Sequence, residues 1–150
     1  MPHTFFVLHM HVVFSTKHRR PLIGPDLQVR LWPYLGSLAR DKKLTPLIIG
    51  GTDNHIHMLM GLPALTLLPH AMRKIKACSS KWVNDTFGRR TGFAWQEGYG
   101  AFAIAASQVD RTIRYIRGQA AHHRRVTFEE EYIAFLKRNN VDYDPAFVFG

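Results

Sequence analysis

The chain has 150 residues, of which 46% are hydrophobic, and this length and composition indicate one compact domain with a single core. No apolar stretch is long enough to cross a membrane, and histidines interrupt the N-terminal apolar run, so we expect no signal peptide. Because Cys78 is the only cysteine, a disulfide scaffold is excluded, and we expect a cytoplasmic protein.

Charge is unevenly distributed along the chain. There are 20 Lys and Arg against 11 Asp and Glu, which gives a formal net charge of +9. Residues 1–125 hold 18 of the basic and 6 of the acidic residues, so this part carries +12 and residues 126–150 carry −3. A small domain with this much positive charge attracts polyanions, which favours nucleic acid as the partner over a basic surface that only confers solubility.

The first half of the chain predicts three strands and one helix. Residues 5–14 alternate apolar side chains with histidines, which is typical of a strand with one buried face. A helix is expected over residues 26–42, because its apolar residues recur at helical spacing. Strands are expected over 44–49 and 55–62, joined by a tight Gly-rich connection at 50–54.

The second half predicts three helices and two short strands. In chain order these are a basic helix ending at about 87, strands over 93–96 and 101–105, a helix over 107–123, an acidic helix over 127–138 and an extended end over 143–149. The element order predicts the α+β class, with a ferredoxin-like antiparallel sheet and helices packed on one face. We expect residues 126–150, the acidic C-terminal helix and tail, to belong to the same domain as residues 1–125.

Two histidines are candidate metal ligands. Alternate residues of a strand share a face, so His55 and His57 stand side by side, with Cα atoms about 7 Å apart. Two neutral imidazoles at this spacing can share one divalent metal ion, although His-x-His by itself is a weak signal. His9 and His11 have the same spacing, and we interpret them as hydrogen-bonding or surface histidines.

A tyrosine and a glutamine lie one turn apart on the predicted helix over 107–123. Tyr115 and Gln119 fall together on the flank of the apolar stripe of this helix. Tyr115 is a candidate nucleophile, although a phenol with a pKa near about 10 needs help to ionise, and the alternative is a tyrosine at the edge of the core. Gly118 lies between the two and costs the helix about 1 kcal/mol relative to alanine.

Five ordered segments together resemble one known family. They are residues 11–21, 50–57, 79–82, 95–102 and 115–124. In this order they are similar to segments of the HUH single-tyrosine transposases of bacterial insertion sequences. The family includes the IS200-like transposases and their relatives, the REP-associated tyrosine transposases.

The resemblance implies a DNA transposase that cleaves and rejoins single-stranded DNA through a 5′-phosphotyrosine intermediate. Tyr115 would be the catalytic nucleophile on a C-terminal helix, and His55, His57 and Gln119 would bind Mg²⁺ or Mn²⁺. The substrate would be recognised by hairpin ends of a mobile or repeated palindromic element. Family members are typically homodimers, and the sequence leaves open whether Tyr115 serves the histidines of its own chain or those of its partner.

Basic side chains are the candidate DNA contacts. They are Lys17, Arg19, Arg20, Arg73, Lys74, Lys76, Lys81, Arg111 and Arg114. We interpret His122 and His123 as phosphate contacts or a helix cap. The alternative function on the same fold is a non-catalytic protein that binds DNA hairpins or regulates them. An RNA-binding module is disfavoured, because the predicted sheet face presents histidines where such a module needs aromatic side chains.

Overall fold

A computed structural model describes residue 3 and residues 5–150 of the chain. Among these residues four strands form one antiparallel sheet in the order β2-β3-β1-β4, so that β1 and β3 are central. The strands are β1 (His9–Ser15), β2 (Thr45–Gly51), β3 (His55–Gly61) and β4 (Gly100–Ile104). The helices are α1 (Pro25–Asp41), α2 (Leu68–Phe87), α3 (Val109–Arg117), α4 (Gln119–His122) and α5 (Phe128–Arg138), with short 3-10 turns η1 (Lys17–Arg19), η2 (Arg89–Thr91) and η3 (Ala106–Gln108).

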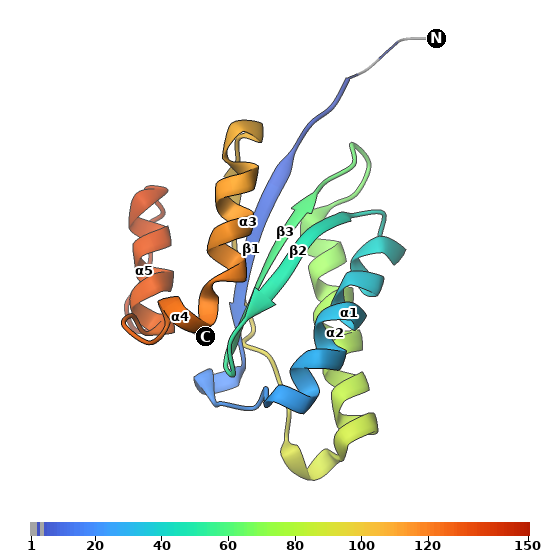
Figure 1. Ribbon diagram of the computed structural model, residues 1–150, viewed down its shortest axis with the longest axis vertical. Coiled ribbons are helices and arrows are strands. Elements are labelled where there is room, and N and C mark those ends of the chain that lie inside the picture. The colour runs from blue at the N-terminus through green and yellow to red at the C-terminus, as the bar shows by residue number, and fades with distance from the viewer. Residues whose placement is uncertain (1–2, 4) are drawn as a thin grey trace.

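The two faces of the sheet have different chemistry, because side chains alternate along each strand. On one face the apolar side chains of β1 and β3, Phe14 and Met58 among them, pack against α1 and α2. The other face presents His11, His55 and His57 and lies beneath α3 and α5 (Figure 1). The histidines of the central strands are therefore enclosed within the molecule.

Helix α5 forms a second, smaller core on the histidine-bearing face. Its buried side chains Phe128, Tyr132, Phe135 and Leu136 pack with Val13 of β1 and Phe102 of β4. The helix begins with a capping box, in which the Thr127 side chain accepts a hydrogen bond from the Glu130 backbone. The C-terminal acidic segment thus packs directly over the middle of the sheet.

The α+β class and the antiparallel sheet are confirmed, with one difference in how the layers are arranged. The helices cover both faces of the sheet, whereas we expected them on one face (Figure 1). The second face carries imidazoles that are removed from water, and helices on that face shield them and contribute hydrogen-bond partners. Among the described residues, no helix is sufficiently long and apolar to span a membrane.

Four expected elements differ from the structure in their bounds or form. The first strand begins only at His9, and residues 93–96 form a single bridge, Thr16 to Trp95, in place of a strand. Residues 145–149, expected to be extended, form turns. The helix expected over 107–123 is divided at Gly118, where α3 ends and α4 begins, in keeping with the low helix propensity of glycine.

Gly50 allows α3 to approach the sheet closely. A Cβ atom at this position of β2 would lie 2.8 Å from both Cγ2 and the carbonyl oxygen of Ile116 in α3. Both distances are shorter than real Cβ contacts, so any larger residue must push α3 away. Because Tyr115 precedes Ile116, this close approach also determines how far Tyr115 lies from the sheet.

We therefore expect Gly50→Ala to lower the free energy of unfolding by about 1–3 kcal/mol, as overpacking in a core does. Gly36→Ala in α1 is the matched control, since its Cβ would lie no closer than 3.5 Å to a neighbouring atom. Replacing a glycine within a helix should raise stability by about 1 kcal/mol or less. Urea unfolding of both variants measures the difference, and equal stabilities would contradict the close packing of α3 on β2.

Candidate active site

Side chains from three elements meet over the centre of the sheet. His55 and His57 come from β3, Tyr115 from α3 and Gln119 from the start of α4. The Nε2 atom of His55 lies 2.8 Å from Oε1 of Gln119, and the rings of His57 and Tyr115 are 5.8 Å apart at their centroids. The four residues singled out from the sequence are thus brought together within one chain.

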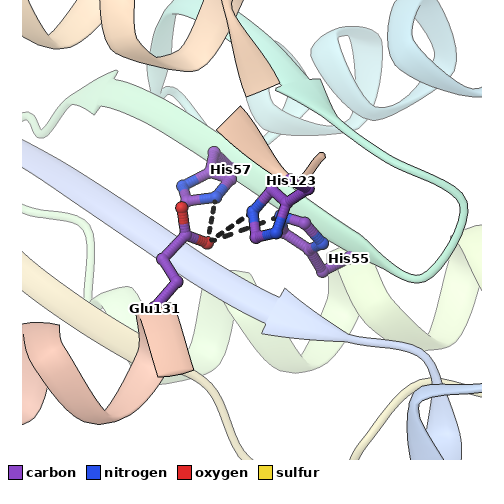
Figure 2. A group of neighbouring side chains, drawn as sticks. All are labelled: His55, His57, His123 and Glu131. Carbon is purple, nitrogen blue, oxygen red and sulfur yellow. Dashed lines mark hydrogen bonds and ion pairs between the residues drawn. The ribbon is translucent and has the colours of Figure 1, made fainter. Parts of the chain in front are cut away.

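The structure adds Glu131 of α5, which the sequence analysis did not single out. Its carboxylate is buried, and Oε1 lies 3.0 Å from Nε2 of His57, 3.2 Å from Nε2 of His123 and 3.5 Å from Nε2 of His55 (Figure 2). A signal for it exists in the sequence, because Glu131 interrupts the apolar stripe that Phe128 and Phe135 define on this helix.

The second carboxylate oxygen of Glu131 faces the predicted nucleophile. Oε2 accepts a hydrogen bond from the Tyr115 hydroxyl, and Nε2 of Gln119 donates to the same oxygen at 3.2 Å. The Tyr115 hydroxyl also lies 3.4 Å from Nε2 of His122. Glu131 therefore contacts both histidines, the glutamine and the tyrosine.

The cluster has the composition and spacing of a divalent metal site. One ligand atom from each of His55, His57, His123 and Glu131 lies within 4.8 Å of all the others. Ligands about 2.1 Å from an octahedral ion lie about 3 Å apart, which matches the spacing of the closest pairs in the cluster. The carboxylate oxygen of Glu131 and the amide oxygen of Gln119 suit Mg²⁺ or Mn²⁺, and the imidazole nitrogens are ligands for divalent transition metals. The residues present therefore fit the ion that the resemblance implies.

Neighbours fix the orientation of the two β3 histidines. Nδ1 of His55 lies 2.9 Å from both Oδ1 of Asn54 and Oγ1 of Thr52, and these contacts orient the ring. When Nδ1 carries the proton, Nε2 of His55 faces Oε1 of Gln119 with a lone pair, and a cation between these two acceptors would satisfy both. Nδ1 of His57 lies 2.7 Å from Nε2 of His11, which agrees with the interpretation of His11 as a hydrogen-bonding histidine. Such contacts are typical of histidines that bind metals.

Burial controls the charge of the cluster. Desolvation, followed by the nearby charge of His57, lowers the pKa of His11 and of His55 to about 3, so both rings are neutral at neutral pH. Burial by itself raises the pKa of Glu131, but the close approach of His123 and the hydrogen bonds of His57 and Tyr115 outweigh it and hold that pKa below its ordinary value. Burial and the carboxylate of Glu131 raise the pKa of Tyr115, which keeps the phenol protonated.

The predicted DNA contacts lie on both sides of the sheet. Arg111 and Arg114 are exposed on α3, and a cavity of about 520 Å³ is lined by Arg111, Tyr115 and Arg138. The contacts predicted in η1 and just after it lie near α5, since Arg19 is 3.8 Å from Glu129. Lys17, Arg19 and Arg20 belong to this group.

The remaining predicted contacts belong to α2, on the face of the sheet opposite the histidines. They are Arg73, Lys74, Lys76 and Lys81. Lys76 is half-buried, and its Nζ donates to the carbonyl oxygens of Glu97 and Gly98. Lys81 pairs with Asp85 at 2.6 Å. The structure thus brings none of these four to the histidine cluster.

Residues 4–119 match the model of a transposase family, the IS200-like transposases. This match spans most of the chain and includes the histidine strand, the tyrosine and the glutamine. The chain belongs to the IS200-like transposase family, and the resemblance found in the sequence is confirmed. Helix α5 and Glu131 lie beyond the matched residues.

Two solved structures share the fold. One is a protein of Deinococcus radiodurans R1 described as a candidate transposase, with a TM-score of 0.65 and 18% identity, covering 79% of this chain and 95% of that chain. The other is a REP-associated tyrosine transposase bound to a REP hairpin, with a TM-score of 0.61 and 16% identity, covering 82% of this chain and 74% of that chain. No curated protein matches the chain in sequence.

The neutral imidazoles make metal-free stability depend on pH. The pKa of His11 and of His55 is about 3 in the folded protein and 6.5 as its ordinary value, so acid protonates these rings only in the unfolded chain. The free energy of unfolding should therefore fall as the pH drops below about 6.5, by up to about 1.4 kcal/mol per pH unit for each ring.

Urea unfolding in EDTA at pH 7, 6 and 5 measures this slope. His11→Phe should make it shallower, whereas His70→Phe, at an exposed position of α2, should leave it unchanged. Stability that does not change between pH 7 and pH 5 would contradict burial of neutral rings.

Proposed function

We propose that this transposase cleaves and rejoins single-stranded DNA with Tyr115 as nucleophile and a divalent ion held by His55, His57 and Gln119. The observation that carries the proposal is the meeting of these four side chains in one buried cluster, with the tyrosine hydroxyl at its edge. The cavity next to Tyr115 supports it, because a DNA strand needs a path to the hydroxyl.

The proposed reaction is a transesterification. The phenolic oxygen of Tyr115 forms a bond to the scissile phosphorus as the bond from phosphorus to the 3′ oxygen breaks. The phenolic proton leaves to a neighbouring acceptor, and the departing 3′ oxygen gains a proton. The products are a 5′-phosphotyrosine and a free 3′-OH. A 3′-OH from another end can reverse the step, so that rejoining needs no separate energy source.

Each residue of the cluster has a role in this scheme. The ion, when bound, stabilises negative charge on the phosphate oxygens. His55, His57 and Gln119 hold it, while Asn54 and His11 orient the two imidazoles through their Nδ1 atoms. Burial raises the pKa of Tyr115, so the phenol stays protonated until substrate and ion are in place.

We propose a DNA hairpin as the recognised element, at the end of a mobile element or in a repeated palindrome. The solved REP-associated tyrosine transposase with this fold is bound to a REP hairpin, which supports the proposal. Arg111 lines the cavity and Arg114 is exposed on the same helix, so in this proposal both contact the strand that enters the cavity, while Lys17 and Arg20 contact other phosphates. The alternative is a protein that binds the hairpin without cutting it.

We expect the wild-type protein to form a covalent adduct with labelled single-stranded DNA from the flanks of its own gene. Formation should need Mg²⁺ or Mn²⁺, and EDTA and Tyr115→Phe should each abolish it, because the phosphotyrosine bond cannot form without ion or hydroxyl. Tyr34→Phe, in α1 on the opposite face, is the control and should react normally. A denaturing gel separates the adduct, and tight binding without adduct would favour the non-catalytic alternative.

The contacts between Tyr115, Glu131 and the histidines within one chain also support a site assembled in cis. We therefore expect a mixture of His57→Ala chains and Tyr115→Phe chains to form no adduct, since every cis site lacks one group. Recovered adduct in the mixture would show instead that two subunits share their sites. The homodimer remains a prediction, and light scattering during size-exclusion chromatography measures it.

A further inference from the structure

Glu131 is the one acidic side chain buried in the histidine cluster among the described residues, and it is 4% exposed. An ionised carboxylate out of water costs several kcal/mol unless its partners compensate it. A helix that only covered the sheet would be more stable with an apolar residue at this position, between Phe128 and Phe135. The placement of a carboxylate here therefore calls for a function.

The position of Oε1 is that of a metal ligand. It lies between 3.0 and 3.5 Å from Nε2 of His55, His57 and His123, which approach it from different directions (Figure 2). The Nε2 atom of His123 is buried and makes no hydrogen bond, although it points into the cluster. A buried nitrogen without a hydrogen bond, next to a carboxylate and two further imidazoles, indicates a set of ligands suited to a cation.

The charge of the predicted ligands is a second reason to assign Glu131 to the metal site. Imidazole and amide ligands such as His55, His57 and Gln119 bring no negative charge to an ion, whereas Mg²⁺ and Mn²⁺ favour carboxylate oxygens. Adding Glu131 supplies the negative charge that this set lacks. At the same time Oε2 accepts a hydrogen bond from the Tyr115 hydroxyl, so one carboxylate reaches both the ion site and the nucleophile.

We propose that Glu131 is a further ligand of the divalent ion through Oε1 and a positioning residue for Tyr115 through Oε2. The inference rests on the proposed function and deepens it, since it makes α5 part of the active site. Residues 4–119 match the family, so this contribution comes from a segment outside the matched part of the chain.

A direct measurement of ion binding tests whether Glu131 is a metal ligand. Glu131→Gln keeps the size and the hydrogen-bonding oxygen but removes the charge. We expect the affinity for Mn²⁺, measured without DNA by electron paramagnetic resonance, to fall at least about tenfold, the loss typical when a metal site loses a supporting group. Glu130→Gln, exposed on the same helix, is the matched control and should bind Mn²⁺ as wild type does. Equal affinity in Glu131→Gln and wild type would overturn the ligand role.

The variant Glu131→Asp tests whether Glu131 positions Tyr115. It keeps the charge but withdraws the carboxylate by one methylene, so at saturating Mn²⁺ we expect at least tenfold slower adduct formation. A wild-type rate at saturating Mn²⁺ would overturn the positioning role. Circular dichroism of each variant confirms that it is folded.

Mn²⁺ binding and adduct formation by the wild-type protein distinguish a failure of this inference from a failure of the proposed function. If wild type binds Mn²⁺ and forms the adduct while both Glu131 variants match it, only the role of Glu131 fails. If wild type itself forms no adduct with Mn²⁺, the proposed function fails.

Discussion

The central strand β3 is buried on both faces, yet one of its faces carries two imidazoles. Rings removed from water need partners, and the chain supplies them from several elements: His11 from β1, Gln119 from α4 and Glu131 from α5. The apolar side of the same strand anchors α1 and α2. The sheet is therefore both the core of the fold and the floor of the site, and the helices above it are held by polar as well as apolar contacts.

Two glycines determine how the nucleophile helix meets this floor. Gly50 leaves room for Ile116, which lets α3 lie close to β2. Gly118 ends α3, so that Tyr115 and Gln119 belong to different helices although four positions separate them. Despite the break, both side chains reach the same carboxylate oxygen of Glu131. The shared contact with Glu131 thus keeps the tyrosine and the glutamine together across the break in the helix.

The role of the C-terminal segment follows from the fold and not from its composition. In the sequence it is an acidic region after a basic domain, and the family match ends before it. In the structure its apolar stripe packs on Val13 and Phe102, and this packing places the Glu131 carboxylate in the histidine cluster. Among the described residues, the acidic side chains of this segment include the one buried carboxylate that contacts His57 and Tyr115.

The sequence by itself determined the features that depend on neighbouring residues. Period-two alternation predicted β1 and β3 and placed His55 beside His57, and helix spacing placed Tyr115 near Gln119. It could not predict the contacts of His57 with His11 and Glu131, which are 46 and 74 residues away in the chain. An apolar stripe says that a helix face is buried but not against which surface, so only the tertiary structure decided that α5 covers the histidines.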